Sequence, residues 1–357
     1  MVAGDAHAVR RARAAAQLLH RPRAAGVAEV VARLLAVQAQ DLRAARLALR
    51  ARATGLAAAD VDAALTEDRS VVVAWLGRGT LHLVGRDDYP WLLALTAPTR
   101  LATSRRRLGQ EGVAPDDAER AVKIVERALA DAGPLTRPEL AERIAAKGIR
   151  TEGQAAPHLL GLAGLRGIAV LGPLRDDGSH AFALTRDWLG AAPPRKLEGP
   201  DRDGALAELA RRYLAGHGPS TPADLAKWSG LPLRDARAGL KAIASELAQR
   251  DDDLVDLAAR DPAPDAIPAR LLPAFDPYLL GWKDRSFAVP GAHAKRVHPG
   301  GGMLRATAIV DGLAVGTWTA PGGDVKLEPF GRLPRGARRA LQAEADEVRG
   351  FTSARPS

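Results

Sequence analysis

A nine-residue pattern occurs twice in this chain and constrains its fold more than any other feature. The two copies, residues 133–141 and 218–226, align without a gap and share the sequence Gly-Pro-x-Thr-x-x-acid-Leu-Ala. At the start of a helix, a threonine hydroxyl can accept a free backbone N–H, and an acid three residues later can reach back to the threonine N–H. Each copy therefore predicts the first turn of a helix.

The order of elements after each copy is also similar. A second helix is predicted at 152–165 after the first copy, where it is a candidate recognition helix, and another element follows at 232–249 after the second copy. Strands follow in both cases, near 168–171 and 181–185 after the first copy and near 254–257 after the second. This order is typical of a winged helix, a helix-turn-helix with a β-ribbon. The alternative is two unrelated capped helices in an alanine-rich chain.

The two ends of the chain complete the predicted fold. The periodicity of apolar residues predicts three N-terminal helices and then a two-stranded ribbon: 6–19, 27–37 and 43–52, followed by 70–76 and 80–84. Near the C-terminus it predicts three strands and a closing helix: 271–280, 303–310, 313–319 and 330–349. Asp311-Gly312 between the last two strands is a signal for a tight hairpin.

We therefore predict an α+β fold with three tandem winged-helix units, followed by a small C-terminal β-rich domain. The predicted boundaries are 1–110, 111–190 and 201–260 for the winged helices and 269–357 for the last domain.

Positive charge is concentrated in the first third of the chain. Residues 1–110 carry 17 arginines, no lysine and nine acidic residues, a net charge of +8, whereas the whole chain of 357 residues has +9. An asymmetry over so long a segment points to nucleic acid, because arginine can grip two phosphate oxygens at once. For any single cluster a solvated helix face is the alternative. The candidate DNA contacts are Arg43, Arg46, Arg78, Arg105, Arg106 and Arg107.

Several chemistries are excluded by composition. Cysteine is absent, so disulfides, thiolate zinc sites and cysteine nucleophiles are ruled out. No apolar run reaches the roughly 18 residues that a membrane span needs. His293 and His298 lie in a predicted loop and His82 in a predicted strand, where we expect it to be buried or hydrogen-bonded. We expect a cytoplasmic protein, associated with the nucleoid, that needs no metal or cofactor.

Gln38-Ala39-Gln40 is an unusual polar stretch at the predicted end of the second helix. Two neutral amides flank one small apolar residue, just where the chain should turn. On these residues alone, an exposed polar helix end is the simpler interpretation. Asp41 directly follows and could act electrostatically or cap the next helix.

Four segments together resemble the winged-helix DNA glycosylases of the AlkZ/YcaQ type. They occur in the expected order over almost the whole chain: Leu-Ala-Val-Gln-Ala-Gln-Asp at 35–41, Arg-Gly-Thr-Leu-His-Leu-Val at 78–84, Leu-Pro-Ala-Phe-Asp-Pro-Tyr-Leu-Leu-Gly at 272–281 and Val-Asp-Gly-Leu-Ala-Val-Gly-Thr-Trp at 310–318. The resemblance implies three winged helices and a β-barrel that embrace duplex DNA. It also implies excision of N7-alkylated purines, with unhooking of interstrand crosslinks in some members.

The same resemblance makes Gln38 and Gln40 the catalytic residues, in the AlkZ-like pattern with glutamine at both polar positions. An amide does not titrate near neutral pH, but an N7-alkylated purine is already cationic and leaves without protonation. The enzyme must then only position water beside the sugar, which amide groups can do by hydrogen bonding.

We therefore predict a monomeric, monofunctional DNA glycosylase acting on double-stranded DNA. The alternative is a non-catalytic winged-helix DNA-binding protein or regulator, which would not need the two glutamines. A third, weaker alternative is a structural protein whose winged helices bind other proteins.

Overall fold

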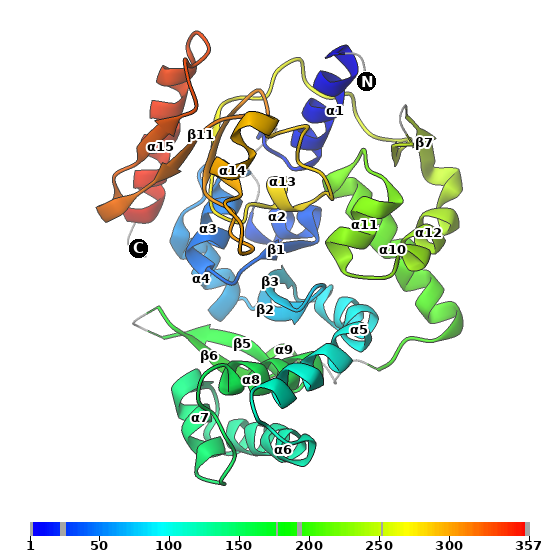
Figure 1. The fold of residues 1–357 in the computed structure, drawn as a ribbon, viewed down its shortest axis with the longest axis vertical. Helices are drawn as coiled ribbons and strands as arrows, with labels where there is room; N and C mark the ends of the chain where they lie inside the picture. Colours follow the sequence, from blue (N-terminus) through cyan, green and yellow to red (C-terminus); the bar gives the residue numbers. More distant parts are fainter. Residues whose placement is uncertain (1–2, 22–25, 176–177, 191–194, 251–252, 354–357) are drawn as a thin grey trace. The chain divides into compact units, whose positions relative to one another are not determined.

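Two units divide the chain in the computed structural model, which describes residues 3–21, 26–175, 178–190, 195–250 and 253–353 (Figure 1). Unit 1 comprises Met1–Val61, Leu206–Trp228 and Pro232–Ser357, and unit 2 comprises Asp62–Ala205 and Ser229–Leu231. Both units combine helices with antiparallel strands, which confirms the predicted α+β class.

Helices and strands follow one another along the whole chain. The first part consists of α1 (Ala3–Ala16), α2 (Val27–Leu34), β1 (Ala36–Gln38), α3 (Leu42–Arg50) and α4 (Ala58–Thr66). Unit 2 continues with β2 (Val71–Leu76), β3 (Thr80–Gly85), α5 (Tyr89–Gln110), α6 (Pro115–Ala132), β4 (Leu135–Thr136), α7 (Arg137–Ala145), α8 (Ala155–Leu165), β5 (Ala169–Leu174), β6 (His180–Leu184) and α9 (Thr185–Leu189). The remaining elements are α10 (Gly199–His217), α11 (Pro222–Ser229), α12 (Leu233–Ala242), β7 (Leu247–Gln249), β8 (Val255–Leu257), β9 (Arg270–Leu272), α13 (Pro277–Leu280), α14 (Ala294–Val297), β10 (Thr307–Val310), β11 (Leu313–Thr319), β12 (Lys326–Pro329) and α15 (Ala337–Ser353).

The second N-terminal helix is shorter than predicted. It ends at Leu34 rather than at residue 37, because Leu35 takes a backbone conformation with a positive φ of 64°. Residues 36–38 then form the strand β1, so the predicted helical setting of Gln38 is wrong. Leu35 is fully buried, and packing therefore overrides the local preference for helix. No sequence pattern indicated α4.

Strands of unit 2 form an antiparallel sheet in the order β3-β2-β5-β6-β4. The ribbon predicted at 70–76 and 80–84 is confirmed as β2 and β3, with Val73 opposite Leu83. His82 lies in β3 with its Nδ1 2.9 Å from the Thr80 carbonyl oxygen, and burial lowers its pKa to about 4. This confirms its predicted hydrogen-bonded setting.

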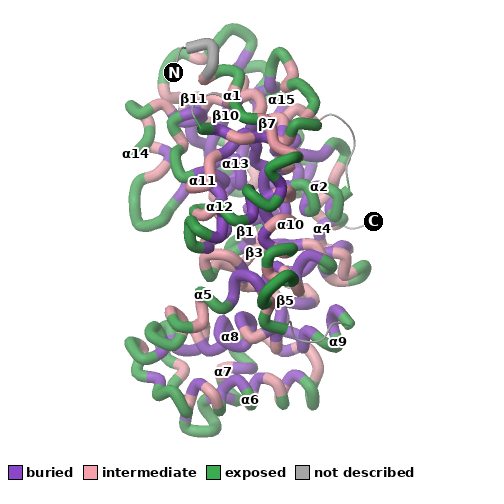
Figure 2. The backbone as a smooth tube through the Cα atoms, turned by 90° about the vertical axis from the view of Figure 1, so that its right-hand side faces the viewer, coloured by how far each residue is buried: buried purple, intermediate pink, exposed green. Residues whose placement is uncertain are grey.

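Helix α8 is part of the core of unit 2 (Figure 2). Every residue from Leu159 to Leu165 is buried, so this part of the predicted recognition helix at 152–165 has no free surface for DNA. Glycines at 161 and 164 explain the close packing. A Cβ on Gly164 would clash with the ring of Trp75. Because glycine has no Cβ, the Trp75 ring can pack directly against the helix backbone.

Both copies of the nine-residue pattern start a helix as predicted. In the first, the Thr136 N–H donates to Glu139 Oε2 at 2.6 Å, completing a capping box at α7. In the second, the Thr221 N–H donates to Asp224 Oδ2 at 3.0 Å, and the Asp224 N–H donates to Thr221 Oγ1 at 3.2 Å. The reciprocal hydrogen bonds are those that the threonine and acid spacing predicts.

The C-terminal strands form an open sheet in the order β12-β11-β10-β9. Four strands are too few to close, since small closed barrels use about eight, so the predicted barrel is wrong for the described residues. The hairpin at Asp311-Gly312 is confirmed, with Val310 opposite Leu313 and positive φ at both turn residues. Helix α15 packs on this sheet, where Leu341 and Val348 share a core with Trp318 (Figure 1).

Helix replaces strand in part of the segment predicted as β at 271–280. Only β9 is extended, and α13 begins at Pro277 because Asp276 caps it, with its carboxylate accepting the Tyr278 N–H at 2.8 Å. Among the helices of the described ranges, none is both long and apolar enough to cross a lipid bilayer.

The predicted module boundaries do not follow the two units. The three predicted N-terminal helices fall in unit 1, whereas the β2–β3 ribbon belongs to unit 2. A repeated module need not coincide with a compact unit, so the boundaries stay a prediction.

Candidate active site

The Gln38-Ala39-Gln40 motif lies in unit 1, at the end of β1 and in the turn that follows. Gln38 is half-buried and Gln40 is exposed, whereas Ala39 between them is only 4% exposed. In an extended segment, alternate side chains point to opposite faces. Ala39 therefore anchors the segment in the core, whereas the amides on either side remain at least partly accessible to solvent.

The entry to this motif is strained. Leu35 has a positive φ, and a buried leucine in such a conformation costs about 1–3 kcal/mol and persists only where the surrounding structure imposes it. Such conformations concentrate at functional sites. Here the chain turns sharply out of α2, so that Gln38 ends the strand β1 and Gln40 lies in the turn that follows, rather than on a helix surface.

Helix α10 holds the end of α2 in place. A Cβ on Gly216 would clash with the Arg33 carbonyl oxygen, so the two backbones approach closely only because residue 216 is glycine. Two arginines link the same helices: Arg33 donates to the Ala215 carbonyl at 3.3 Å, and Arg212 donates to the Ala32 carbonyl at 3.0 Å. The sequence did not predict these contacts between α10 and the end of α2. The one signal that could have indicated them was a lone glycine, Gly216, within a helical pattern.

Asp41 caps α3. Its Oδ1 accepts the backbone N–H groups of Arg43 at 2.9 Å and Ala44 at 3.3 Å. Of the two roles considered for this residue, the structure shows the cap. It is the one carboxylate between Glu29 and Asp60 in the sequence, so the motif itself contains no other acid.

Replacing Asp41 tests this role directly. Asp41→Ala should lower the free energy of unfolding by about 1 kcal/mol, whereas Asp41→Asn should have a much smaller effect, because asparagine caps helices nearly as well. Urea unfolding of the three proteins measures the difference. Equal losses in both variants would show that the charge, rather than the cap, is what stabilises this turn.

Two buried ion pairs hold the other end of α3. Arg52 and Asp276 are fully buried and pair through Nη2 and Oδ1 at 2.7 Å and through Nη1 and Oδ2 at 2.9 Å. Arg50 pairs with the buried Glu344 of α15 at 3.0 Å. Burial alone would raise the pKa of Glu344, but Arg50 and two further arginines, Arg21 and Arg270, hold it below its usual value. The helix that follows the motif is therefore fixed at both ends.

Comparison with known proteins decides the family. A sequence model described as "DNA glycosylase AlkZ-like" matches residues 31–351. The chain belongs to the AlkZ-like DNA glycosylase family. The resemblance inferred from four short segments is thus confirmed over most of the chain, a range that includes the Gln38-Ala39-Gln40 motif.

A sequence match and a structure match show the extent of the similarity. The chain is 28% identical over 342 residues to the interstrand DNA cross-link repair glycosylase of Streptomyces sahachiroi, covering 90% of this chain and 89% of that protein. The solved structure of Streptomyces sahachiroi DNA glycosylase AlkZ matches with a TM-score of 0.78 at 25% identity, covering 98% of this chain and 97% of the other.

The arginines predicted to contact DNA are split between the units of this AlkZ-like protein. Arg43 is exposed and Arg46 half-exposed on α3, which places both close in sequence to the glutamines in unit 1. Arg78 is half-exposed in the β2–β3 turn of unit 2, and the three residues of the 105–107 cluster are exposed on α5. Arg107 also donates to Gln110 at 3.1 Å. Contact with DNA stays a prediction for all six.

Part of the basic charge of segment 1–110 is structural. Arg10, Arg13, Arg50 and Arg52 are buried, and each has an acidic or carbonyl partner within the protein. These arginines are not available to phosphates. The net charge of the segment therefore overstates its DNA-binding surface.

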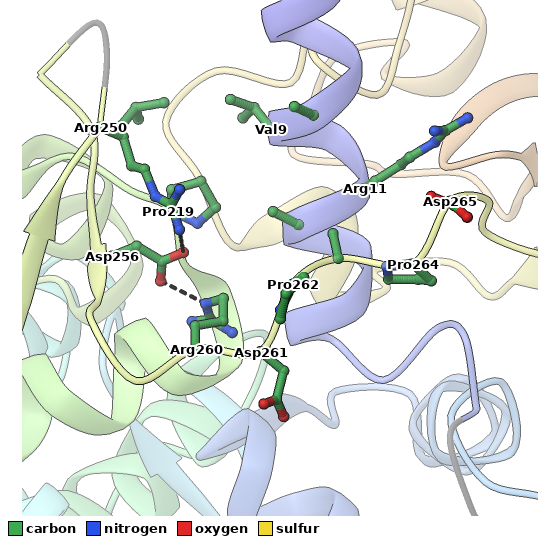
Figure 3. A pocket seen from close by; sticks show the side chains of 14 residues that line it. Val9, Arg11, Pro219, Arg250, Asp256, Arg260, Asp261, Pro262, Pro264 and Asp265 are labelled. Atoms are coloured by element: carbon green, nitrogen blue, oxygen red, sulfur yellow. Dashed lines mark hydrogen bonds and ion pairs between the residues drawn. The ribbon is translucent and has the colours of Figure 1, made fainter.

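A cavity of about 470 Å³ lies in unit 1, and its lining does not include the glutamine motif (Figure 3). Helix α1 and the segment after β8 form its walls, and neither Gln38 nor Gln40 lines it. Its charged groups are largely paired internally: Asp256 with Arg260 at 2.6 Å, and Arg11 with Asp311 at 2.9 Å.

Histidines offer no metal centre in the described part of the chain. His293 stacks on Phe330, with ring centroids 4.4 Å apart, and no group of three His, Cys, Asp or Glu side chains suited to an ion occurs among the described residues.

Proposed function

We propose that this chain hydrolyses the N-glycosidic bond of N7-alkylated purines in duplex DNA, and that interstrand crosslinks formed through such purines are also substrates. The observation that carries the proposal is the pair of amides, Gln38 at the end of β1 and Gln40 in the following turn, which flank the buried Ala39. Family membership supports glycosylase chemistry. The similarity to the interstrand DNA cross-link repair glycosylase of Streptomyces sahachiroi supports crosslinked DNA as a further substrate.

Neutral amides suit a cationic leaving group. A glutamine carbonyl can accept from a water O–H while its NH₂ donates, so two glutamines can orient one water toward the sugar carbon. Their carbonyl oxygens also stabilise positive charge that develops on the sugar as the bond breaks. The water adds to the sugar carbon, the bonding pair leaves with the neutral alkylpurine, and the proton of the water passes to solvent.

Winged-helix architecture supports DNA as the partner, and we propose three such modules, the first containing the Gln38 motif. The second and third proposed modules share one order of elements: a helix, a short extended segment, two helices and two strands. In the second, Leu135 pairs with Phe182, and in the third, the corresponding Ser220 forms a bridge with Val255. Since α8 is buried, α12, with Arg234 and Arg237 exposed, is the better candidate for a DNA-facing helix.

A base-release assay tests the proposed reaction. A duplex with one N7-methylguanine is incubated with excess protein in a chelating buffer, and the free base is quantified. We expect release of the methylated base and an abasic site, with no release from the unmodified duplex. Tight DNA binding without release would instead identify a non-catalytic DNA-binding protein.

Salt dependence tests the electrostatic part of binding. Each phosphate contact contributes about −0.9 to the slope of log K against log salt concentration. We therefore expect a triple variant to have a flatter slope, by about one unit for each phosphate that the replaced side chains neutralise. The triple variant combines Arg105→Ala, Arg106→Ala and Arg107→Ala. The matching triple lysine variant should keep the native slope. If the alanine triple variant retains the full slope, this exposed cluster does not face DNA.

A further inference from the structure

Met303 is the most exposed large hydrophobic side chain among the described residues. It is 47% exposed, and Leu233 on α12, at 38%, is the other large hydrophobic found exposed in these ranges. Apart from the initial residue, it is also the only methionine in the chain. Single exposed hydrophobics are common on protein surfaces, so exposure alone says little.

The backbone around Met303 is built to hold it outward. Gly300, Gly301 and Gly302 all have positive φ, a conformation that favours glycine. The Met303 N–H donates to the Gly300 carbonyl at 3.0 Å, which closes a tight turn. Positive φ at both central residues is the pattern of a type I′ turn. The side chain therefore stands at the end of a defined turn.

Core contacts on the C-terminal side fix this turn. Leu304, the next residue, is 2% exposed and belongs to the hydrophobic cluster that includes Val297 and Ala51. The Arg305 N–H also donates to the Val297 carbonyl at 2.9 Å. Ala51 directly follows α3, the helix that begins after the glutamine motif. Met303 and the two glutamines are thus mounted on the same unit.

Charge around the turn suits a polyanion. From residue 285 to residue 310 the sequence contains four lysines and arginines and no acid. Lys295 and Arg305 are exposed, and the half-exposed Arg296 stacks on the ring of Phe330 at 4.6 Å. A loop that approaches phosphates would favour such an excess of basic over acidic residues.

We propose that Met303 is an apolar wedge that inserts against the base stack of duplex DNA, with Lys295 and Arg305 contacting the flanking phosphates. Methionine is among the side chains that wedge proteins use to unstack base steps and kink a duplex, and its flexible thioether adapts to irregular contacts. This inference rests on the proposed function. It adds that the DNA is deformed at the lesion.

Fluorescence of 2-aminopurine beside an N7-methylguanine tests the wedge before any base is released. With Gln38→Ala as the parent protein, which slows excision, binding should raise the fluorescence as stacking is lost. Adding Met303→Ala should remove most of this rise and weaken affinity about tenfold, the scale expected for losing one buried methionine side chain. Met303→Leu should retain both the fluorescence rise and the affinity. Gln342→Ala, at an exposed position on α15, provides the control and is expected to behave as the parent.

The outcomes separate the wedge from the glycosylase proposal. Unchanged fluorescence and affinity in Met303→Ala, or an equal loss in Gln342→Ala, would overturn the wedge even if the native protein releases the base. A rise that depends on Met303 would support the wedge even if the native protein releases nothing, a result that would overturn the proposed function alone. Thermal unfolding of Met303→Ala should match the parent, because the side chain lies outside the core.

Discussion

Gln38→Ala and Gln40→Ala are each expected to slow single-turnover release of N7-methylguanine by about ten- to a thousandfold, the range for losing one hydrogen bond made in a transition state. Each substitution removes one hydrogen bond to the proposed water. DNA affinity and the free energy of unfolding should stay nearly unchanged, because Gln40 is exposed and Gln38 half-buried. Quenched-flow or manual sampling with excess protein measures the rate.

Gln342→Ala is the matched control for these variants. Gln342 is exposed on α15, and its amide donates to Asp346 at 3.3 Å. Its replacement should leave the rate at the native value. Native rates in both motif variants would show that Gln38 and Gln40 are merely polar residues in a turn.

Asp276→Ala is expected to lower the free energy of unfolding by about 3–5 kcal/mol, since removing one partner leaves a buried charge without compensation. Arg52 would keep two partners, the Gln17 side chain at 2.8 Å and the Ala48 carbonyl at 2.7 Å, but neither is charged. The same change removes the cap of α13, which adds to the loss.

Urea unfolding measures this effect, with Arg43→Ala as the control. Arg43 lies on α3, the helix that precedes Arg52, but its side chain is exposed. Surface substitutions away from caps and buried pairs usually change stability by less than about 0.5 kcal/mol, and we expect the same here. A loss in Asp276→Ala no larger than in Arg43→Ala would show that the buried pair does not fix the end of α3.

Local chemistry made some elements predictable. The threonine and acid of each repeat copy form hydrogen bonds with each other's backbone, so their spacing is enough to place α7 and α11. Likewise, Asp311-Gly312 supplies the two positive φ angles that its hairpin requires. In these cases the residues that carry the signal also make the interaction.

Other elements depend on contacts that lie far apart in sequence. Leu35 breaks α2 with a conformation that leucine disfavours, and its burial explains why it is kept. Helix α8 has the length of a recognition helix, but its glycines admit Trp75 from the distant strand β2. The C-terminal strands were interpreted as a barrel through family resemblance, whereas α15 covers an open four-stranded sheet.

The candidate site was predictable only in part. Periodicity alone made the glutamines an exposed helix end, and the family resemblance singled them out. The structure adds the anchoring of Ala39 and the capping role of Asp41. The sequence did not predict a role for Met303, because one methionine after three glycines gives no periodic pattern. The absence of acidic residues around Met303 was the signal that could have indicated it.

Leaving-group charge gives the most direct test of the proposed mechanism. Matched duplexes carrying N7-methylguanine, N3-methyladenine or uracil are compared under one condition, with the Gln38→Ala/Gln40→Ala double variant as the blank. Because two neutral amides supply no acid to protonate a departing base, we predict release of the two cationic purines and no detectable release of uracil. Efficient excision of uracil would contradict water positioning by Gln38 and Gln40, since that reaction needs stabilisation of an anionic leaving group.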